Sequence, residues 1–120
     1  EVLLGTPAGA RIEKRLFSPG ETLCAPHLID LEVAQVLRRY AAFRDIDARR
    51  AREALEDLSD FPLTRFILTG ILPRIWALRD NITAYDAAYV ALAESLPAPL
   101  VTRDQRLAHA PGHSALVELV

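Results

Sequence analysis

Apolar residues recur at intervals of three and four along most of this chain, which is the period of amphipathic helices. Between Pro7 and Phe17, for example, Ile12 and Leu16 are four residues apart and the residues between them are charged. The stretch from residue 83 to 95 is apolar almost all round, so we expect a buried helix there. The pattern predicts helices at about residues 7–17, 28–42, 47–59, 69–79, 83–95 and 104–109, with Pro73 tolerated in the first turn of the fourth.

Short apolar runs bounded by turn residues separate these helices. They predict strands at about residues 22–25, 62–66, 99–102 and 115–120, and Pro19-Gly20 predicts a turn. Short apolar strands that alternate with helices indicate βαβ units and a parallel sheet covered on both faces. The predicted fold class is therefore α/β, and in such sheets ligands bind beyond the carboxyl ends of the strands.

The composition is that of an ordinary folded domain. The chain has 120 residues, of which 51% are hydrophobic and 25% charged, so we expect one domain over residues 1–120. No apolar run reaches the roughly 20 residues of a membrane span, and a single cysteine forms no intrachain disulfide. A cytoplasmic protein is expected. The net charge of −2 argues against nucleic-acid binding by bulk positive charge.

Three acidic residues are the candidates for chemistry. Glu32 flanks the apolar stripe of its helix, where an ion pair with Arg38 or Arg39, or a side chain that reaches solvent at the helix edge, is the alternative explanation. Asp86 is three residues after Thr83, a spacing that also fits a capping box at a helix start. Asp104 follows a predicted strand and equally suits an N-cap.

Taken together, these acids suggest a metal site. Carboxylates from three separate elements are what Mg²⁺ or Mn²⁺ requires, because hard cations prefer oxygen ligands. The obvious use of such a site is phosphoryl transfer, in which metal neutralises the phosphate and activates water. The hydroxyl of Thr102 would orient a ligand or a water beside Asp104. No phosphate-binding loop, nucleophile elbow or zinc-protease motif competes with this interpretation.

The segments around these acids resemble the conserved blocks of a known nuclease family. Residues 25–39 (APHLIDLEVAQVLRR), 83–93 (TAYDAAYVALA) and 100–107 (LVTRDQRL) resemble those of PIN-domain nucleases, most closely the VapC-type toxin ribonucleases of bacterial toxin–antitoxin pairs. The resemblance implies a three-layer α/β/α sandwich with a mainly parallel central sheet. It also implies catalytic, metal-binding roles for Glu32, Asp86 and Asp104, with Thr102 in support, in the Mg²⁺- or Mn²⁺-dependent cleavage of RNA.

In that family a fourth acid, an aspartate, ends the first strand, and the sequence from Glu1 onward has neither that strand nor that acid. The sequence also has no methionine, so we expect residues upstream of Glu1 in the natural protein. The resemblance further implies a homodimer and a small antitoxin whose basic tail suits an acidic groove. Arg79, Arg103 and Arg106 are the expected RNA contacts, although solvated surface explains each of them as well.

Two other functions are compatible with the residues. A non-catalytic PIN-like module would bind RNA or a partner protein, with the acids serving as caps and ion pairs. A receiver-type module would require a lysine late in the chain, whereas the only lysine is Lys14.

Overall fold

The computed structural model describes all 120 residues and divides into two compact units, Glu1–Arg65 and Phe66–Val120. Each unit contains helices and short strands, so the α/β class predicted from the sequence is confirmed. None of the helices combines the length and the apolar character that a membrane span requires.

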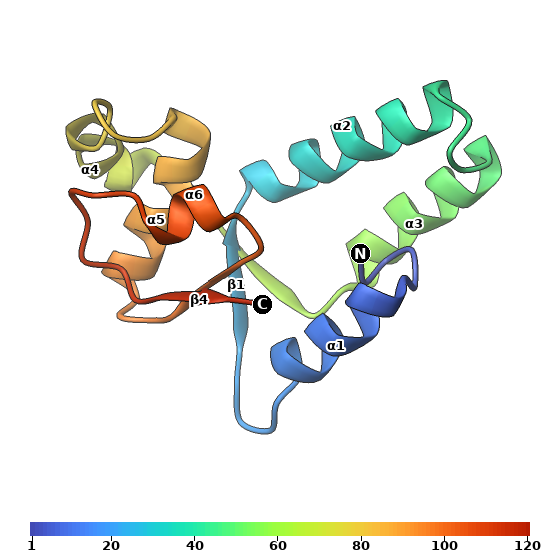
Figure 1. Ribbon diagram of the computed structural model, residues 1–120, viewed down its shortest axis with the longest axis horizontal. Coiled ribbons are helices and arrows are strands. Elements are labelled where there is room, and N and C mark those ends of the chain that lie inside the picture. Colours follow the sequence, from blue (N-terminus) through green and yellow to red (C-terminus); the bar gives the residue numbers. More distant parts are fainter. The chain divides into compact units, whose positions relative to one another are not determined.

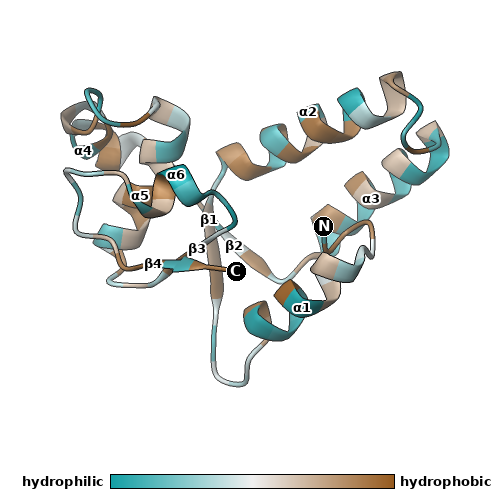
Figure 2. Ribbon diagram, in the orientation of Figure 1, coloured by the Kyte–Doolittle hydropathy of each residue, from teal (hydrophilic) through white to brown (hydrophobic).

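The first unit is built around a pair of helices. Its elements are α1 (Pro7–Leu16), β1 (Leu23–Pro26), α2 (Leu28–Ala42), α3 (Ala48–Asp60) and β2 (Leu63–Phe66), and β1 pairs with β2. In Figure 1, α2 and α3 lie side by side and are joined by a short turn. Figure 2 shows the mixture of hydrophilic and hydrophobic positions along α3 that lets one side of this helix be buried.

The core of this unit lies between α2 and α3. Leu37, Ala51 and Ala54 are buried at its centre, and partly buried apolar residues pack around them: Leu3, Leu4, Val33, Ala41 and Ile46. The small alanines allow the two helices to approach closely. The predicted turn is also present, since Gly20 has a φ of +81° and the amide of Glu21 donates to the carbonyl of Ser18 at 3.2 Å.

The second unit contains a parallel pair of strands and a buried helix. Its elements are the 3₁₀ helix η1 (Thr69–Ile71), α4 (Leu72–Ala77), α5 (Ala84–Ser95), β3 (Leu100–Thr102), α6 (Gln105–Ala108) and β4 (Val117–Leu119). β3 and β4 are parallel, with Val101 opposite Glu118 and Thr102 opposite Leu119. The parallel pairing expected of βαβ units is therefore present.

Helix α5 is the centre of this unit, as its nearly uniform apolar sequence predicted. Ala87, Ala88, Val90, Ala91, Leu92 and Ala93 are all buried. The preceding helix contributes Ile75 and Leu78 to the same interior, and Leu100 and Leu107 are buried on the strand and helix that follow. The start of α5 and the end of β3 are thus anchored by apolar packing, and both carry candidate acids.

One predicted element differs from the structure. Residues 69–79 were expected to form a continuous helix, but a 3₁₀ turn covers Thr69–Ile71 and the α-helix runs only from Leu72 to Ala77. Pro73 lies in the first turn of α4 and has no amide hydrogen to continue a helix that begins earlier. Gly70 weakens helix formation before it.

Candidate metal and RNA site

Asp86 lies in the first turn of α5 with an unpaired carboxylate. Thr83 is the N-cap, and its hydroxyl accepts the backbone N–H of Asp86 at 3.2 Å. A complete capping box would also have the Asp86 carboxylate accept the N–H of Thr83, and that bond is absent. The carboxylate, which is half-buried, makes no hydrogen bond or ion pair within its unit. The capping explanation therefore accounts for Thr83 but leaves the Asp86 side chain unused.

Asp104 follows the carboxyl end of β3 and caps α6. Its Oδ1 accepts the backbone N–H groups of Arg106 at 2.8 Å and Leu107 at 3.4 Å. The N-cap role anticipated from the sequence is thus confirmed. Both bonds are made by the same oxygen, so Oδ2 has no protein partner within the unit. The backbone holds this carboxylate in one orientation and leaves one oxygen for a ligand.

Thr102 supports Asp104 through the backbone. Its Oγ1 accepts the N–H of Asp104 at 3.1 Å, and its carbonyl accepts the N–H of Val120 at 2.9 Å. These contacts tie the residue after β3 to the parallel strand pair. The hydroxyl proton of Thr102 is still available to donate to a ligand or a water.

Glu32 lies in the second turn of α2, in the first unit, and is half-buried. The alternative explanation from the sequence was an ion pair with Arg38 or Arg39. The Arg38 Nε donates to the Gln35 side chain at 3.0 Å.

The three acids are distributed over both units, Glu32 in the first and the two aspartates in the second. Within neither unit do three or more histidine, cysteine or acidic side chains gather as a metal site. The chemistry of the donors nevertheless fits Mg²⁺ or Mn²⁺, since Asp86 offers a whole carboxylate and Asp104 offers one oxygen.

An acid that the sequence interpretation missed has the most elaborate surroundings. Asp30, in the first turn of α2, receives two hydrogen bonds from the Arg65 guanidinium, at 2.7 Å to Oδ2 and 2.8 Å to Oδ1. Arg65 also donates to the carbonyl of Leu58 at 3.0 Å. The hydrogen bonds from Arg65 hold the pKa of Asp30 below its ordinary value. Asp30 therefore joins α2 to β2 and has a structural role.

The only sequence signal for this pair was a lone arginine in the apolar run Leu63–Phe66. Its partner is 35 residues away, so spacing alone does not identify it. Glu94 on α5 is a similar case, since it is held by Arg74 Nε at 3.1 Å and by the Ser114 hydroxyl at 3.2 Å. Acids with such partners are poor candidates for metal binding.

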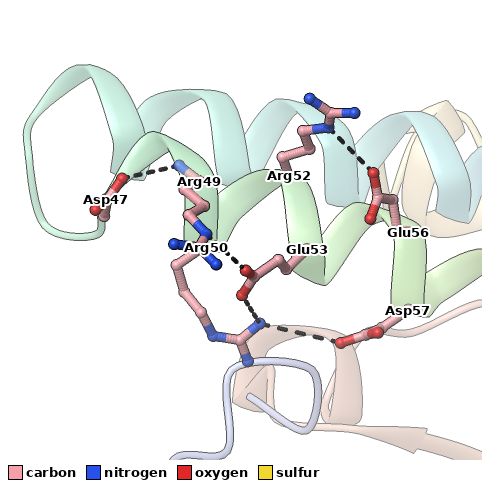
Figure 3. Close-up of polar contacts among 7 residues, drawn as sticks. All are labelled: Asp47, Arg49, Arg50, Arg52, Glu53, Glu56 and Asp57. Atoms are coloured by element: carbon pink, nitrogen blue, oxygen red, sulfur yellow. Dashed lines mark hydrogen bonds and ion pairs between the residues drawn. The ribbon is translucent and has the colours of Figure 1, made fainter.

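The arginines divide into neutralised and available groups. On α3, Arg49 pairs with Glu53 at 3.2 Å and Arg52 pairs with Glu56 at 3.1 Å. Figure 3 shows this row, in which Arg50 also lies 4.0 Å from Glu53 and 4.0 Å from Asp57. The positive charge of this helix is therefore balanced by its own acids.

Two of the three arginines expected to contact RNA carry no such partner. Arg79, just after α4, and Arg106, on α6, are exposed and form no ion pair within their unit. Arg79 instead places its guanidinium carbon 4.8 Å from the centroid of the Trp76 ring. Arg103 is exposed beside Asp104, immediately after β3. All three lie in the unit that contains Asp86 and Asp104.

Comparison with known proteins places this geometry in context. The model of the PIN domain family matches residues 1–112, a range that includes all three acids. The VapC ribonuclease Mb0985 of Mycobacterium bovis is 44% identical over 95 residues, which are 79% of this chain and 75% of that protein. Ribonuclease VapC12 of Mycobacterium tuberculosis is 40% identical over 120 residues, which are 100% of this chain and 92% of that protein. Ribonuclease VapC1 of the same species is 44% identical over 97 residues, which are 80% of this chain and 73% of that protein.

Proposed function

The chain belongs to the PIN domain family, and from this premise we propose that it is a metal-dependent endoribonuclease toxin of the VapC type. Relatives that are 40–44% identical to it over the aligned residues carry the name of VapC ribonucleases. The structural observation that supports the proposal is the state of two acids. Asp86 and Asp104 each keep carboxylate oxygens without a partner in their unit, whereas Asp30 and Glu94 have theirs satisfied.

In this proposal Glu32, Asp86 and Asp104 hold Mg²⁺ or Mn²⁺ and are the catalytic acids. When bound, the metal neutralises the scissile phosphate and lowers the pKa of a bound water. The chain's own contribution is orientation. The N–H groups of α6 fix the Asp104 carboxylate, and the hydroxyl of Thr102 fixes the backbone at Asp104 and has a proton to donate to a ligand. Arg79, Arg103 and Arg106 would bind the flanking phosphates of the RNA.

The proposal extends to partners and place of action. The acidic site of a chain with net charge −2 suits a cognate antitoxin that presents a basic tail. We also propose that the protein acts as a homodimer in the cytoplasm and that residues 1–120 function as a single PIN-like domain. A basic-tailed protein encoded beside this gene, bound at one copy per chain and abolishing cleavage, is the expected antitoxin.

Cleavage of RNA by the purified protein tests the catalytic proposal. The parent should cleave single-stranded or looped RNA in Mg²⁺ or Mn²⁺ and lose that activity in EDTA. Asp86→Asn should cleave at a small fraction of the parent rate, because the amide has no negative charge for the cation. Asp45→Asn, which alters an exposed acid in the turn between α2 and α3, is the matched control and should cleave like the parent.

A non-catalytic PIN-like module that binds RNA or protein is the alternative. It predicts that the parent and Asp86→Asn bind RNA equally and that EDTA changes nothing. Equal cleavage by the parent and Asp86→Asn would also contradict the assignment of Asp86.

A further inference from the structure

Trp76 is a large aromatic residue that the second unit leaves in solvent. It lies on α4, and 68% of its surface is exposed. Ile75, directly before it, and Leu78, the residue after the helix, are buried in the interior of the unit, so α4 is anchored by apolar packing. Tryptophan is enriched at binding interfaces, because its ring combines a large apolar face with a polar N–H.

Arg79 gives this exposed ring a positive charge. Its guanidinium carbon is 4.8 Å from the ring centroid, and its Nη1 donates to the carbonyl of Trp76 at 3.0 Å. These two contacts hold the guanidinium against the indole. The other N–H groups of Arg79 have no acceptor within the unit, and no acid neutralises its charge. The ring is thus paired with a cation that still has donors to offer.

The position of the pair in the chain is also informative. The turn after α4 is held by bonds from the amides of Asn81 and Ile82 to the carbonyl of Leu78, at 3.1 and 3.2 Å. This turn leads directly into α5, whose first turn contains Asp86. Trp76 and Arg79 therefore lie at one end of a short, hydrogen-bonded connection and the candidate catalytic acid lies at the other.

We infer that Trp76 and Arg79 form a platform for one unpaired nucleotide of the RNA, the base stacking on the indole and a phosphate bonding to the guanidinium. This inference rests on the proposed ribonuclease function and names the residues that would hold an unpaired nucleotide. Exposed aromatic rings and arginine planes are the surfaces on which proteins stack splayed-out bases. In a duplex the base is already stacked between its neighbours, so the platform discriminates against duplex RNA.

A second copy of the chain is the competing occupant, because Leu72 is also exposed, one turn before Trp76. Charge favours RNA. A twofold interface places the same patch of both copies face to face, so two unneutralised Arg79 side chains would approach one another. RNA instead supplies a phosphate for the guanidinium and a π-face for the indole.

The protein provides its own probe, because Trp76 is its only tryptophan. The Asp86→Asn protein, used to prevent cleavage, is titrated with a labelled single-stranded RNA oligonucleotide in Mg²⁺. Stacking of a base on the indole should quench the tryptophan emission. The quenching should follow the same titration curve as the rise in anisotropy of the labelled RNA. A fully paired duplex of the same sequence should quench it far less at equal occupancy.

Substitutions measure how much the platform contributes. Trp76→Leu should weaken single-strand binding by roughly 5- to 150-fold, the range for loss of one stacked base. Trp76→Phe should retain most of the affinity. Arg79→Gln should reduce the slope of log affinity against log salt by about 0.7, the amount for one phosphate contact on a single strand. Phe43→Leu, which changes an equally exposed aromatic residue in the first unit, should bind like the parent.

Unquenched emission at saturating RNA, or equal binding by Trp76→Leu and the parent, would overturn the inference. So would a dimer that Trp76→Leu converts to a monomer while RNA affinity stays the same, because the patch would then be an interface between copies. Cleavage by the parent is measured separately. If the parent cleaves RNA but RNA does not quench the tryptophan emission, only the platform is refuted. If RNA quenches the emission but the parent does not cleave, only the nuclease proposal is refuted.

Discussion

Two substitutions of Asp104 separate its role as a helix cap from its proposed role as a metal ligand. Asparagine and aspartate are nearly equal N-caps, because the side-chain oxygen that accepts the backbone N–H is present in both. Asp104→Asn therefore keeps the bonds to Arg106 and Leu107 and removes the negative charge. Asp104→Ala removes both the cap and the charge. If Asp104 is a metal ligand, the two variants should have the same effect on metal binding and different effects on the fold.

The magnitudes follow from the two hydrogen bonds of the cap. One is short, 2.8 Å to the N–H of Arg106, and the other is long, 3.4 Å to that of Leu107. Loss of such a cap costs typically about 1 kcal/mol, so Asp104→Ala should lower the free energy of unfolding by that amount. Asp104→Asn should stay within about 0.5 kcal/mol of the parent, since only the interaction of its charge with the dipole of a short helix is lost.

Metal binding should respond to the charge alone. Partners that merely orient a ligand are worth about 10- to 100-fold in metal affinity or activity, so loss of a direct carboxylate ligand should cost at least the upper end of that range. Both variants should therefore cleave RNA at least about a hundredfold more slowly than the parent. The fold of the asparagine variant should be intact, and that of the alanine variant slightly weakened.

The assays are urea unfolding in EDTA and in Mn²⁺, together with cleavage rates at fixed Mn²⁺. A ligand at roughly ten times its Kd stabilises the folded state by about 1.4 kcal/mol, and the parent should show this gain while both variants lose most of it. If Asp104→Asn cleaves within a few-fold of the parent and keeps the Mn²⁺ effect, Asp104 is only a cap. The metal assignment of this residue would then be wrong.

Three further substitutions test the fold around the candidate site. Thr83→Ala should destabilise the protein by about 1 kcal/mol, because the hydroxyl that accepts the N–H of Asp86 is lost, whereas Thr83→Ser should retain most of that stability; urea midpoints measure both. Leu78→Ala should cost about 2–5 kcal/mol, since this side chain is only 1% exposed, and Leu78→Met should cost less than about 1.5 kcal/mol in the same assay. Hydrogen bonding to Arg65 lowers the pKa of Asp30 in the folded state. The contribution of the ionised Asp30 side chain to the free energy of unfolding is therefore complete above about pH 4, and it is lost as the pH falls through the folded pKa. Asp30→Asn should therefore make stability less dependent on pH in the acid range, and thermal unfolding that falls as steeply with pH as in the parent would contradict this.

The sequence predicted the helices well where local signals were strong. Residues 28–42 were expected to be helical and are, because a regular apolar stripe begins after Pro26 and no breaker interrupts it. The start of α5 was predictable from Thr83, whose hydroxyl caps the helix as its position suggested. The region of η1 and α4 was less predictable, since Gly70 and Pro73 weaken a pattern that is otherwise helical.

The candidate site shows where sequence information ends. Local spacing identified Asp104 as a cap, because a cap bonds to residues two and three positions later. The pairing of Asp30 with Arg65 depends on how a helix and a strand far apart in sequence pack, and no local pattern encodes it. Whether a carboxylate is satisfied or available is set by such distant contacts. Sequence alone therefore nominated Asp86 without showing that its carboxylate is unpaired, and it did not reveal that Arg65 satisfies Asp30.

At Asp104, capping would support the proposed metal binding. A metal ligand must be held in the correct orientation before the ion arrives, and a side chain that rotates freely loses affinity through the entropy of ordering it. The N–H groups of α6 bind one carboxylate oxygen and so fix the direction of the other. A capping hydrogen bond can therefore orient a carboxylate for metal binding with residues that are close in sequence. Only a substitution that changes the charge and keeps the shape, such as Asp104→Asn, distinguishes the role of helix cap from that of metal ligand.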